Sequence, residues 1–456
     1  MAKIIKKYLP ITLILLAATF LRFYRLKDFF PYTIDEEYLS QLAWTIVHDF
    51  HVIWIGVSAG STNFYLGPGY IYVTAFLLWI GRGNPLALAY WVSFIGVATV
   101  FSMWWIVKKA ITPKAALIAS SIYGFSYFIA LYDRHFWPPI VSFTLLWMAY
   151  FLWEARKDTR WLIPFFFVLG VSLHLHLSLF VCAPIALWVV LRNRKQLRLS
   201  TILLYVISYV LAVSPLIVYD FVHNFDNLRA PFLMLSHSSG GSLNLVPRLS
   251  TMLIVVSKIV DPATSTVFLG TILVLFCALG VFALRKKIPS FIALSLATFG
   301  LLTVLFFIYP GRVEEYYLIG TFPFIAVLFS YVLQSFVPQK PLIFLLSIFL
   351  VSSIFMLATT KPLYNAYSQK EKVIEAIKKI TKNEPILLNT KGPYVFDGGW
   401  HFLFTQAGIP VTQGSSSEMY NWIYTQYYTP PTRAVYTVIL ENKDGGVKYT
   451  INPNIQ

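Results

Sequence analysis

Three consecutive acidic residues, Asp35, Glu36 and Glu37, follow the first apolar segment of a chain in which only 12% of the residues are charged. A carboxylate placed where a chain leaves a membrane can serve as a general base. The same segment also has a purely structural interpretation. Thr33 precedes Glu36 by three residues, the spacing of a helix capping box, and apolar residues recur at helical spacing behind it. The acids would then only complement the dipole of an amphipathic helix.

Three further polar clusters are expected at the same face of the membrane. They are Asp133, Arg134 and His135; Asp220, His223, Asp226 and Arg229; and Arg312, Glu314 and Glu315. Each cluster alone is compatible with no function, because polar side chains at a membrane boundary can reach water and Asp133 could pair with its neighbour Arg134. The convergence of four separated loops on one side favours a functional site.

Two histidines, His174 and His176, lie in a very apolar stretch. Burying an imidazole has a free-energy cost that hydrogen bonding or function must offset, so these residues are candidates to line a cavity. A metal site is the alternative. Residues two apart on a helix point to different faces, however, and no cysteine or third histidine is near in sequence. A metal is therefore not indicated.

The composition determines the class of protein that must position these residues. Hydrophobic residues make up 57% of the 456 residues and the mean hydropathy is +0.66, which predicts a polytopic helical membrane protein. The net charge of +16 comes from Lys and Arg in short loops between apolar runs, so it reports membrane orientation and not nucleic-acid binding. The two cysteines, Cys182 and Cys277, lie inside apolar runs and indicate no disulfide framework.

The basic loops predict a topology for an integral protein of the plasma membrane. Lysines before the first apolar segment place the N-terminus in the cytoplasm, the segment has no cleavage site, and Asp35 is then outside. The stretch 161–191 lies between two basic clusters, so it must cross an even number of times and is expected to break near His174 to Ser178. About eleven helices result. The apolar runs are 8–20, 86–107, 115–132, 140–153, two within 161–191, 199–218, 268–284, 289–308, 316–336 and 341–357.

The fold class expected is therefore mainly α, a transmembrane bundle with a small extracytoplasmic α/β domain at its C-terminal end. Residues 1–360 would form the transmembrane catalytic domain, with outer loops at about 22–85 and 219–267. Residues 361–456 are richer in charge, and they contain a helix over 370–380 and strands over 386–388, 436–440 and 447–451. We expect this part to lie outside the cell as a soluble domain with its aromatic residues in its own core.

Most of residues 1–360 resembles the GT-C superfamily of membrane glycosyltransferases, near the protein O-mannosyltransferases and lipid A aminoarabinose transferases. The most specific mark is the acidic pair at the start of the first outer loop followed by Tyr38. The stretch 65–70, Tyr-Leu-Gly-Pro-Gly-Tyr, is similar to a juxtamembrane helix of that branch, and 312–318, Arg-Val-Glu-Glu-Tyr-Tyr-Leu, is similar to its Arg-rich loop. Two departures exist. Trp137 and two prolines stand where many relatives have a second acid, and His176 stands near the position of a lysine.

The resemblance implies transfer of one sugar from a polyprenyl-phosphate carrier in the bilayer to a hydroxyl of a protein, lipid or glycan acceptor, outside the cell and with inversion. Asp35 would take the acceptor proton and Glu36 would position it. The donor phosphate would bind Arg312, Arg134 and Arg229. The substrate cavity would be lined by Glu37, Tyr38, Asp133, His135, His174, His176, Glu315 and Tyr316. No cofactor is expected.

Two other functions remain open. A transporter or flippase of lipid-linked sugars would line a pathway with the same polar residues, but its binding groups would be expected near the membrane midplane. A polysaccharide ligase or polymerase would share the carrier chemistry and transfer a whole chain.

Overall fold

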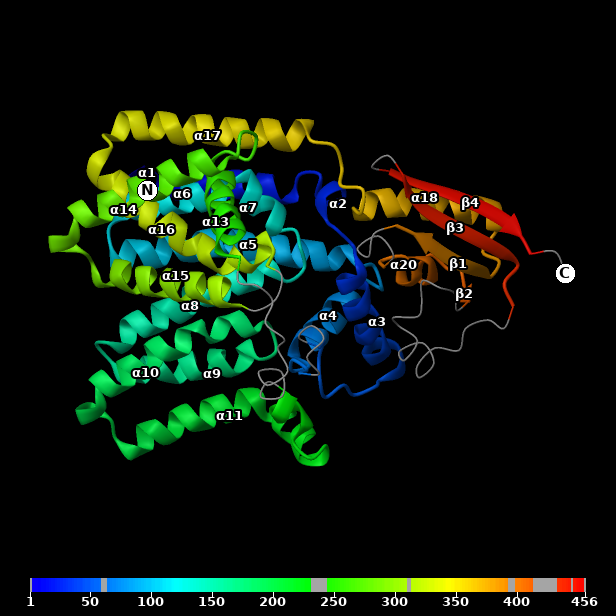
Figure 1. The fold of residues 1–456 in the computed structure, drawn as a ribbon, viewed down its shortest axis with the longest axis horizontal. Coiled ribbons are helices and arrows are strands. Elements are labelled where there is room, and N and C mark those ends of the chain that lie inside the picture. Colours follow the sequence, from blue (N-terminus) through cyan, green and yellow to red (C-terminus); the bar gives the residue numbers. More distant parts are fainter. Residues whose placement is uncertain are drawn as a thin grey trace.

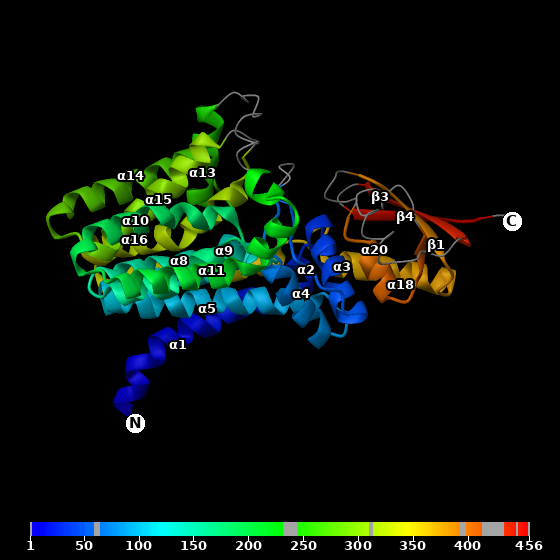
Figure 2. The ribbon, with the colours of Figure 1, turned by 90° about the horizontal axis from the view of Figure 1, so that it is seen from below.

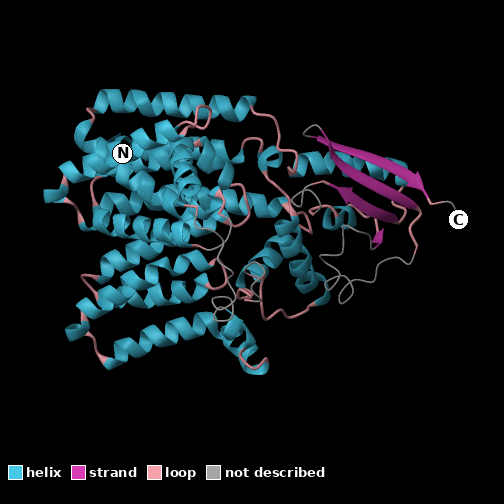
Figure 3. Ribbon diagram, viewed as in Figure 1, coloured by secondary structure: helices cyan, strands magenta, loops and turns pink. Residues whose placement is uncertain are grey.

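A computed structural model describes residues 2–58, 64–230, 244–309, 313–392, 398–412, 433–443 and 446–454. A bundle of helices forms most of the molecule, and a small sheet lies beyond one end of it (Figures 1 and 3). The predicted fold class, mainly α with a small C-terminal α/β part, is confirmed. The predicted boundary at residue 360 stays a prediction.

Each predicted apolar run corresponds to one or more helices of the bundle. The bounds are α1 (Ala2–Phe23), α5 (Leu86–Ala110), α6 (Pro113–Phe125), α7 (Tyr127–Tyr132), α8 (Pro138–Ala155), α9 (Leu162–Ser172), α10 (Ala183–Arg192), α11 (Leu199–Val222), α14 (Val267–Ala283), α15 (Ser290–Ile308), α16 (Phe322–Phe336) and α17 (Gln339–Thr359). Among the described residues, five helices are long and apolar enough to cross a membrane. The chain is a multi-pass membrane protein.

The break predicted within 161–191 is present. Helix α9 ends at Ser172, a turn follows, and the 3-10 helix η2 (Leu177–Cys182) leads into α10. The run 115–132 is also divided, because the backbone bends at Ser126 between α6 and α7. The Ser126 hydroxyl accepts from the amide of Ile129 and donates to the carbonyl of Ile259, so the free backbone groups at the bend are satisfied within the bundle.

Burial differs widely among equally apolar helices. Within residues 315–336, which include α16, about 83% of the most apolar 18-residue stretch is buried inside the protein, whereas the corresponding value for α17 is only 17%. Lipid chains accept apolar side chains as readily as a protein core does, so hydropathy alone does not distinguish the two positions. In Figure 1, α17 runs along one edge of the bundle.

The outer segments contain helices of their own. The first holds α2 (Leu26–Phe29), α3 (Ile34–Asp49) and α4 (Gly69–Ile80), all at the end of the bundle that faces the sheet (Figures 1 and 2). The segment expected as a loop at 219–267 includes an unpredicted amphipathic helix, α13 (Leu245–Val260). Arg248 on α13 donates to the carbonyls of Phe306 and Phe307 at the end of α15, which attaches the segment to the bundle.

The C-terminal part is a four-stranded sheet with helices packed on it. Helix α18 (Tyr367–Thr381) precedes the sheet, whose strand order is β2 (Val411–Thr412), β1 (Ile386–Lys391), β3 (Tyr436–Lys443) and β4 (Gly446–Pro453). Strand β1 is parallel to both neighbours, and β3 and β4 form an antiparallel hairpin. The short helix α20 (His401–Gln406) lies between the sheet and α3.

The C-terminal part does not have a core separate from the outer helices. One cluster of buried apolar side chains contains residues from both, including Tyr32, Leu42, Ile374, Trp400 and Val438. Backbone bonds reinforce this contact, because the Tyr32 amide donates to the carbonyl of Asn365 and the Tyr367 amide donates to that of Phe30. The first outer segment and the described residues after 360 therefore form one structural unit.

Candidate active site

The three acids at the start of α3 have three different environments. Thr33 and Glu36 form the predicted capping box that begins the helix. Asp35 is exposed, and among the described residues its carboxylate makes no hydrogen bond or ion pair. Desolvation by the surrounding protein nevertheless raises the pKa of Asp35 above its usual 3.8, so this carboxylate reaches water from a confined position.

Glu36 is buried and serves its own helix. Its carboxylate accepts from the Thr33 amide at 2.9 Å and from the Thr33 hydroxyl at 2.6 Å. Burial, with a further contribution from the negative charge of Asp35, raises the pKa of Glu36 to about 7. These contacts give Glu36 a defined structural duty, and its predicted positioning role stays a prediction.

Replacing Glu36 by Gln is expected to raise thermal stability at pH 8 and to leave it nearly unchanged at pH 5. Because the pKa of Glu36 is higher in the folded protein than in the unfolded chain, its contribution to stability is fully present below about pH 4.5 and is lost as the pH rises through about 7. Gln stays neutral and still accepts the Thr33 amide hydrogen. Thermal denaturation at both pH values should show a difference of about 1–2 kcal/mol. Equal shifts at pH 5 and pH 8 would contradict this assignment.

Glu37 faces the C-terminal part and is 1% exposed. Its two carboxylate oxygens accept from the backbone amides of Gly399 and Phe402, each at 2.7 Å, around the start of α20. Tyr38, one residue on, is half-buried, and burial raises its pKa well above the usual 10.

The start of α4 joins the acidic helix to the 133–137 turn. The hydroxyl of Tyr70 donates to the carbonyl of Phe136, and the two rings are stacked with centroids 4.7 Å apart. The Glu36 carboxylate is also close enough to the Tyr70 hydroxyl for an electrostatic interaction between them. The turn after α7 is thereby held next to the first turn of α3.

His174 connects α4 to α11. Its Nδ1 accepts from the Gly69 amide at 3.0 Å, and its Nε2 donates to the carbonyl of Ala212 at 2.8 Å. The glycines of the 65–70 stretch permit this approach, because a Cβ on Gly67 would lie 2.2 Å from the His174 ring. Both ring nitrogens are therefore engaged with the backbone, and His174 holds the scaffold together.

His176 and Tyr316 both contact the indole ring of Trp137. The imidazole stacks on the indole with a centroid distance of 5.2 Å and an interplanar angle of 5°, and Tyr316 contacts the indole edge-on at 5.7 Å. His176 Nδ1 is bonded to Ser178, at the start of η2. Trp137, a departure from the pattern of the resembled family, is thus the residue that brings two predicted cavity residues together.

Glu315 lies next to a lysine that sequence reasoning missed. Its carboxylate pairs with Lys258 of α13 at 2.5 Å and accepts from the Tyr132 hydroxyl at 2.9 Å. His135 packs against the Tyr132 ring. Lys258 stands in the amphipathic helix that was expected to be a loop, so only its 3.6-residue apolar periodicity could have indicated it.

Asp133 and Arg134 do not pair with each other. Asp133 is buried and accepts from Arg22 Nε at 2.8 Å, with Nη2 of the same ion pair at 2.7 Å, and the guanidinium also donates to the carbonyl of Gly124. Arg134 is fully buried and donates to the carbonyls of Leu21 and Tyr24. Its Nε and Nη1 have no partner among the described residues. Arg22, at the outer end of the first apolar segment, was the sequence signal for this buried ion pair with Asp133.

The two other arginines predicted to bind the donor phosphate are Arg229 and Arg312. Arg229 is exposed, in a short helical segment over 226–230. That segment is attached to the first outer loop, because Asn227 bonds to both the amide and the carbonyl of Tyr65, and Asp220 accepts the Asn227 amide. Arg312 lies outside the described residues.

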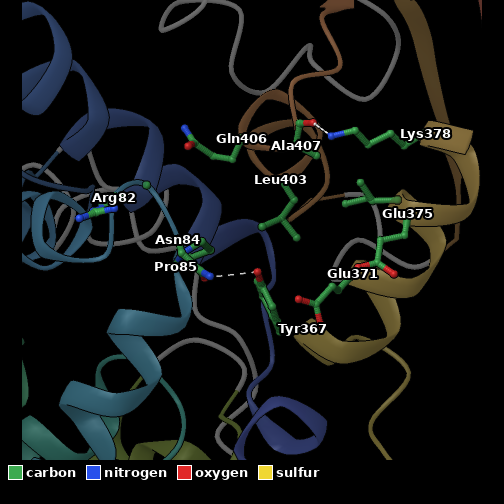
Figure 4. Close-up of a pocket in the computed structure, with 12 residues that line it drawn as sticks. Arg82, Asn84, Pro85, Tyr367, Glu371, Glu375, Lys378, Leu403, Gln406 and Ala407 are labelled. Carbon is green, nitrogen blue, oxygen red and sulfur yellow. Dashed lines mark hydrogen bonds between the residues drawn. The ribbon is translucent and has the colours of Figure 1, made fainter. Parts of the chain in front are cut away.

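A pocket of about 300 Å³ lies between the C-terminal part and the start of α5 (Figure 4). Glu371 and Glu375 of α18 line one wall, and Asn84 approaches Tyr367 at 3.3 Å across it. None of its lining residues belongs to the predicted site. The pocket is a gap in the joint between the two parts of the molecule.

Comparison with known proteins gives a fold and no closer match. No family model and no curated protein matches the chain. Several solved structures match it in fold. ArnT from Cupriavidus metallidurans bound to undecaprenyl phosphate is similar with a TM-score of 0.62 and 11% identity over 95% of this chain and 93% of ArnT. The chain has the GT-C fold.

Two further solved structures have a similar fold. ArnT in the apo state matches with a TM-score of 0.63 and 11% identity, over 97% of this chain and 94% of that one. The Archaeoglobus fulgidus oligosaccharyltransferase complex with Zn and sulfate matches with a TM-score of 0.50 and 11% identity, over 94% of this chain and 68% of that one. The predicted resemblance to the GT-C superfamily is therefore confirmed for the fold.

Proposed function

We propose that this protein transfers a sugar from a polyprenyl-phosphate donor to an acceptor hydroxyl at the extracytoplasmic face, with Asp35 as the general base. The observation that supports this most is that the carboxylate of Asp35 makes no hydrogen bond or ion pair with any described residue, whereas both neighbouring acids are hydrogen-bonded. The GT-C fold supports it as well, because ArnT with that fold has been solved with undecaprenyl phosphate bound.

The environment of Asp35 suits a base. Desolvation raises its pKa above the usual 3.8, which increases the affinity of the carboxylate for the acceptor proton. The leaving group is a lipid phosphate, which is already stable as an anion, so no acid is needed to protonate it. One carboxylate can then serve the reaction, and the absence of an acid at Trp137 is no obstacle.

Lys258 is our candidate for the donor phosphate among the described residues, beside the predicted Arg312 and Arg229. It lies at the same rim as Tyr132 and Glu315, and its side chain is 28% exposed, so an anion can reach it. A phosphate in a poorly solvated site is stabilised more strongly by a fixed cation than it would be in water. Arg134 is less suited, because it is fully buried against backbone carbonyls and the Phe29 ring.

Transport is the weaker alternative. The region that favoured it was His174 to His176, deep in an apolar stretch. Both ring nitrogens of His174 are bonded to the backbone, and Nδ1 of His176 is bonded to Ser178. The described polar clusters instead contact neighbouring outer segments, because Glu315 accepts from Tyr132 and Asn227 bonds to Tyr65.

Purified protein incubated with a panel of radiolabelled polyprenyl-phosphate sugars should release the label of one donor from the lipid. Lys258→Met should raise the apparent KM for that donor about tenfold, an expectation based on the loss of one charge-assisted contact. The acceptor KM should change less than twofold. Movement of intact labelled donor across a vesicle membrane, with no label leaving the lipid, would favour a flippase instead.

A further inference from the structure

The face of α3 opposite Asp35 is bound to the C-terminal part of the molecule. Residues two apart on an α-helix are about 200° apart around its axis, so Asp35 and Glu37 point in opposite directions. Glu37, Gln41 and Trp44 recur at helical spacing, and all three approach α20. Glu37 accepts two amides there, Gln41 contacts His401 at 3.4 Å, and Trp44 packs edge-on against Phe402.

A buried lysine completes this contact. Lys370 of α18 is 0% exposed, donates to the carbonyl of Gly398 at 2.7 Å, and lies 4.4 Å from the centre of the Trp400 ring. Burial lowers the pKa of Lys370 to about 7, and the negative charges of Glu37 and Glu36 act against that shift. Lys370 and Glu37 therefore both bind the backbone of the 398–402 turn, Lys370 at the carbonyl of Gly398 and Glu37 at the amides of Gly399 and Phe402.

The backbone of that turn fits against α3 with no space to spare. A Cβ on Gly398 would lie 2.5 Å from the Cα of Ile34, and one on Gly399 would lie 2.2 Å from the carbonyl oxygen of Tyr32. Gly399 also has a positive φ of 82°, which a glycine adopts without strain. A side chain at either glycine would therefore displace the backbone of residues 32–34.

We propose that Glu37 is a positioning residue for the transfer reaction and that, with Lys370, it forms a clamp through which the C-terminal part fixes the orientation of Asp35. This inference rests on the proposed function, because it assigns Glu37 a duty toward the same base. A displacement of about 1 Å at a reacting group can lower a rate about 100-fold, so a helix start held by two short hydrogen bonds matters for turnover.

Glu37→Ala should lower kcat about 100-fold and leave the donor KM within twofold. Glu37→Gln, whose amide offers one acceptor oxygen in the same shape, should fall between Glu37→Ala and the wild type. Glu371→Gln is the matched control, because it breaks the exposed Lys27 ion pair between the same two parts of the molecule, and it should leave kcat within twofold.

Loss of folding is separated from loss of positioning by the double variant Glu37→Gln/Lys370→Met. It replaces two buried ionisable groups by neutral side chains of similar shape and should recover the melting temperature of the wild type. Its kcat should stay at least tenfold low. Recovery of full turnover together with stability would overturn the positioning role, as would a Glu37→Ala variant with near wild-type kcat.

Hydrogen–deuterium exchange tests the clamp without any substrate. Glu37→Ala should speed exchange in residues 33–38 and 398–402 together, and Glu371→Gln should change neither. Faster exchange in only one segment would overturn the clamp even where sugar transfer is observed. Coupled exchange in a protein that transfers no sugar would overturn the proposed function and leave the clamp standing.

Discussion

Asp35→Asn is expected to lower sugar transfer by a factor of about 10²–10⁴ without lowering the amount of folded protein in the membrane. The amide cannot take the acceptor proton, whereas the shape of the side chain is kept. Because Asp35 makes no hydrogen bond or ion pair within the described ranges, the substitution removes no contact there. Initial rates with the labelled donor, normalised to monodisperse protein, measure the effect.

Two comparisons make this result specific. Asp226→Asn changes another exposed acid of the outer segments and should leave the rate unchanged. The wild-type rate should fall as the pH drops through the pKa of Asp35, which desolvation raises from 3.8, because only the ionised form accepts a proton. Near-normal turnover by Asp35→Asn would remove the catalytic assignment.

Asp133→Ala is expected to destabilise the protein by about 3–5 kcal/mol, because it leaves the buried charge of Arg22 without its partner. Membrane fractions should then contain little monodisperse protein, and the melting temperature should fall. Asp158→Asn is the matched control. Its ion pair with Arg160 is exposed, and its loss should leave the melting temperature unchanged.

The combined variant Arg22→Met/Asp133→Leu should recover much of the lost stability, since it leaves no charge buried. Turnover per folded molecule decides whether Asp133 also lines the substrate cavity, as predicted from the sequence. We expect that value to stay close to the wild type. A stable double variant with no turnover would instead show that the acid contributes to the reaction.

Local sequence signals predicted local structure well. The spacing of Thr33 and Glu36 predicted the start of α3, and the even number of crossings between two basic clusters predicted the break after α9. Helix α13 was missed because Arg248 and Lys258 interrupt its apolar pattern, and neither charge is explained until its partners on α15 and at Glu315 are known.

The different environments of Asp35, Glu36 and Glu37 could not be predicted from the sequence. Glu36 is bonded to a residue three positions away, which a motif can indicate. Glu37 is bonded to amides more than 360 positions away, and Asp133 to an arginine 111 positions away. No periodicity or spacing reports such partners, so Asp35 differs from its neighbours only after the chain has folded.

The bond between Glu37 and Gly399 also has a consequence for biosynthesis. The two residues are separated by 362 positions, so at about 5–20 residues per second a ribosome makes the second roughly 20–70 s after the first. Throughout that interval the nascent first outer segment lacks the turn that fixes α3. The first outer segment of a partly synthesised chain therefore enters the membrane without this contact, which forms only after the 398–402 turn has been made.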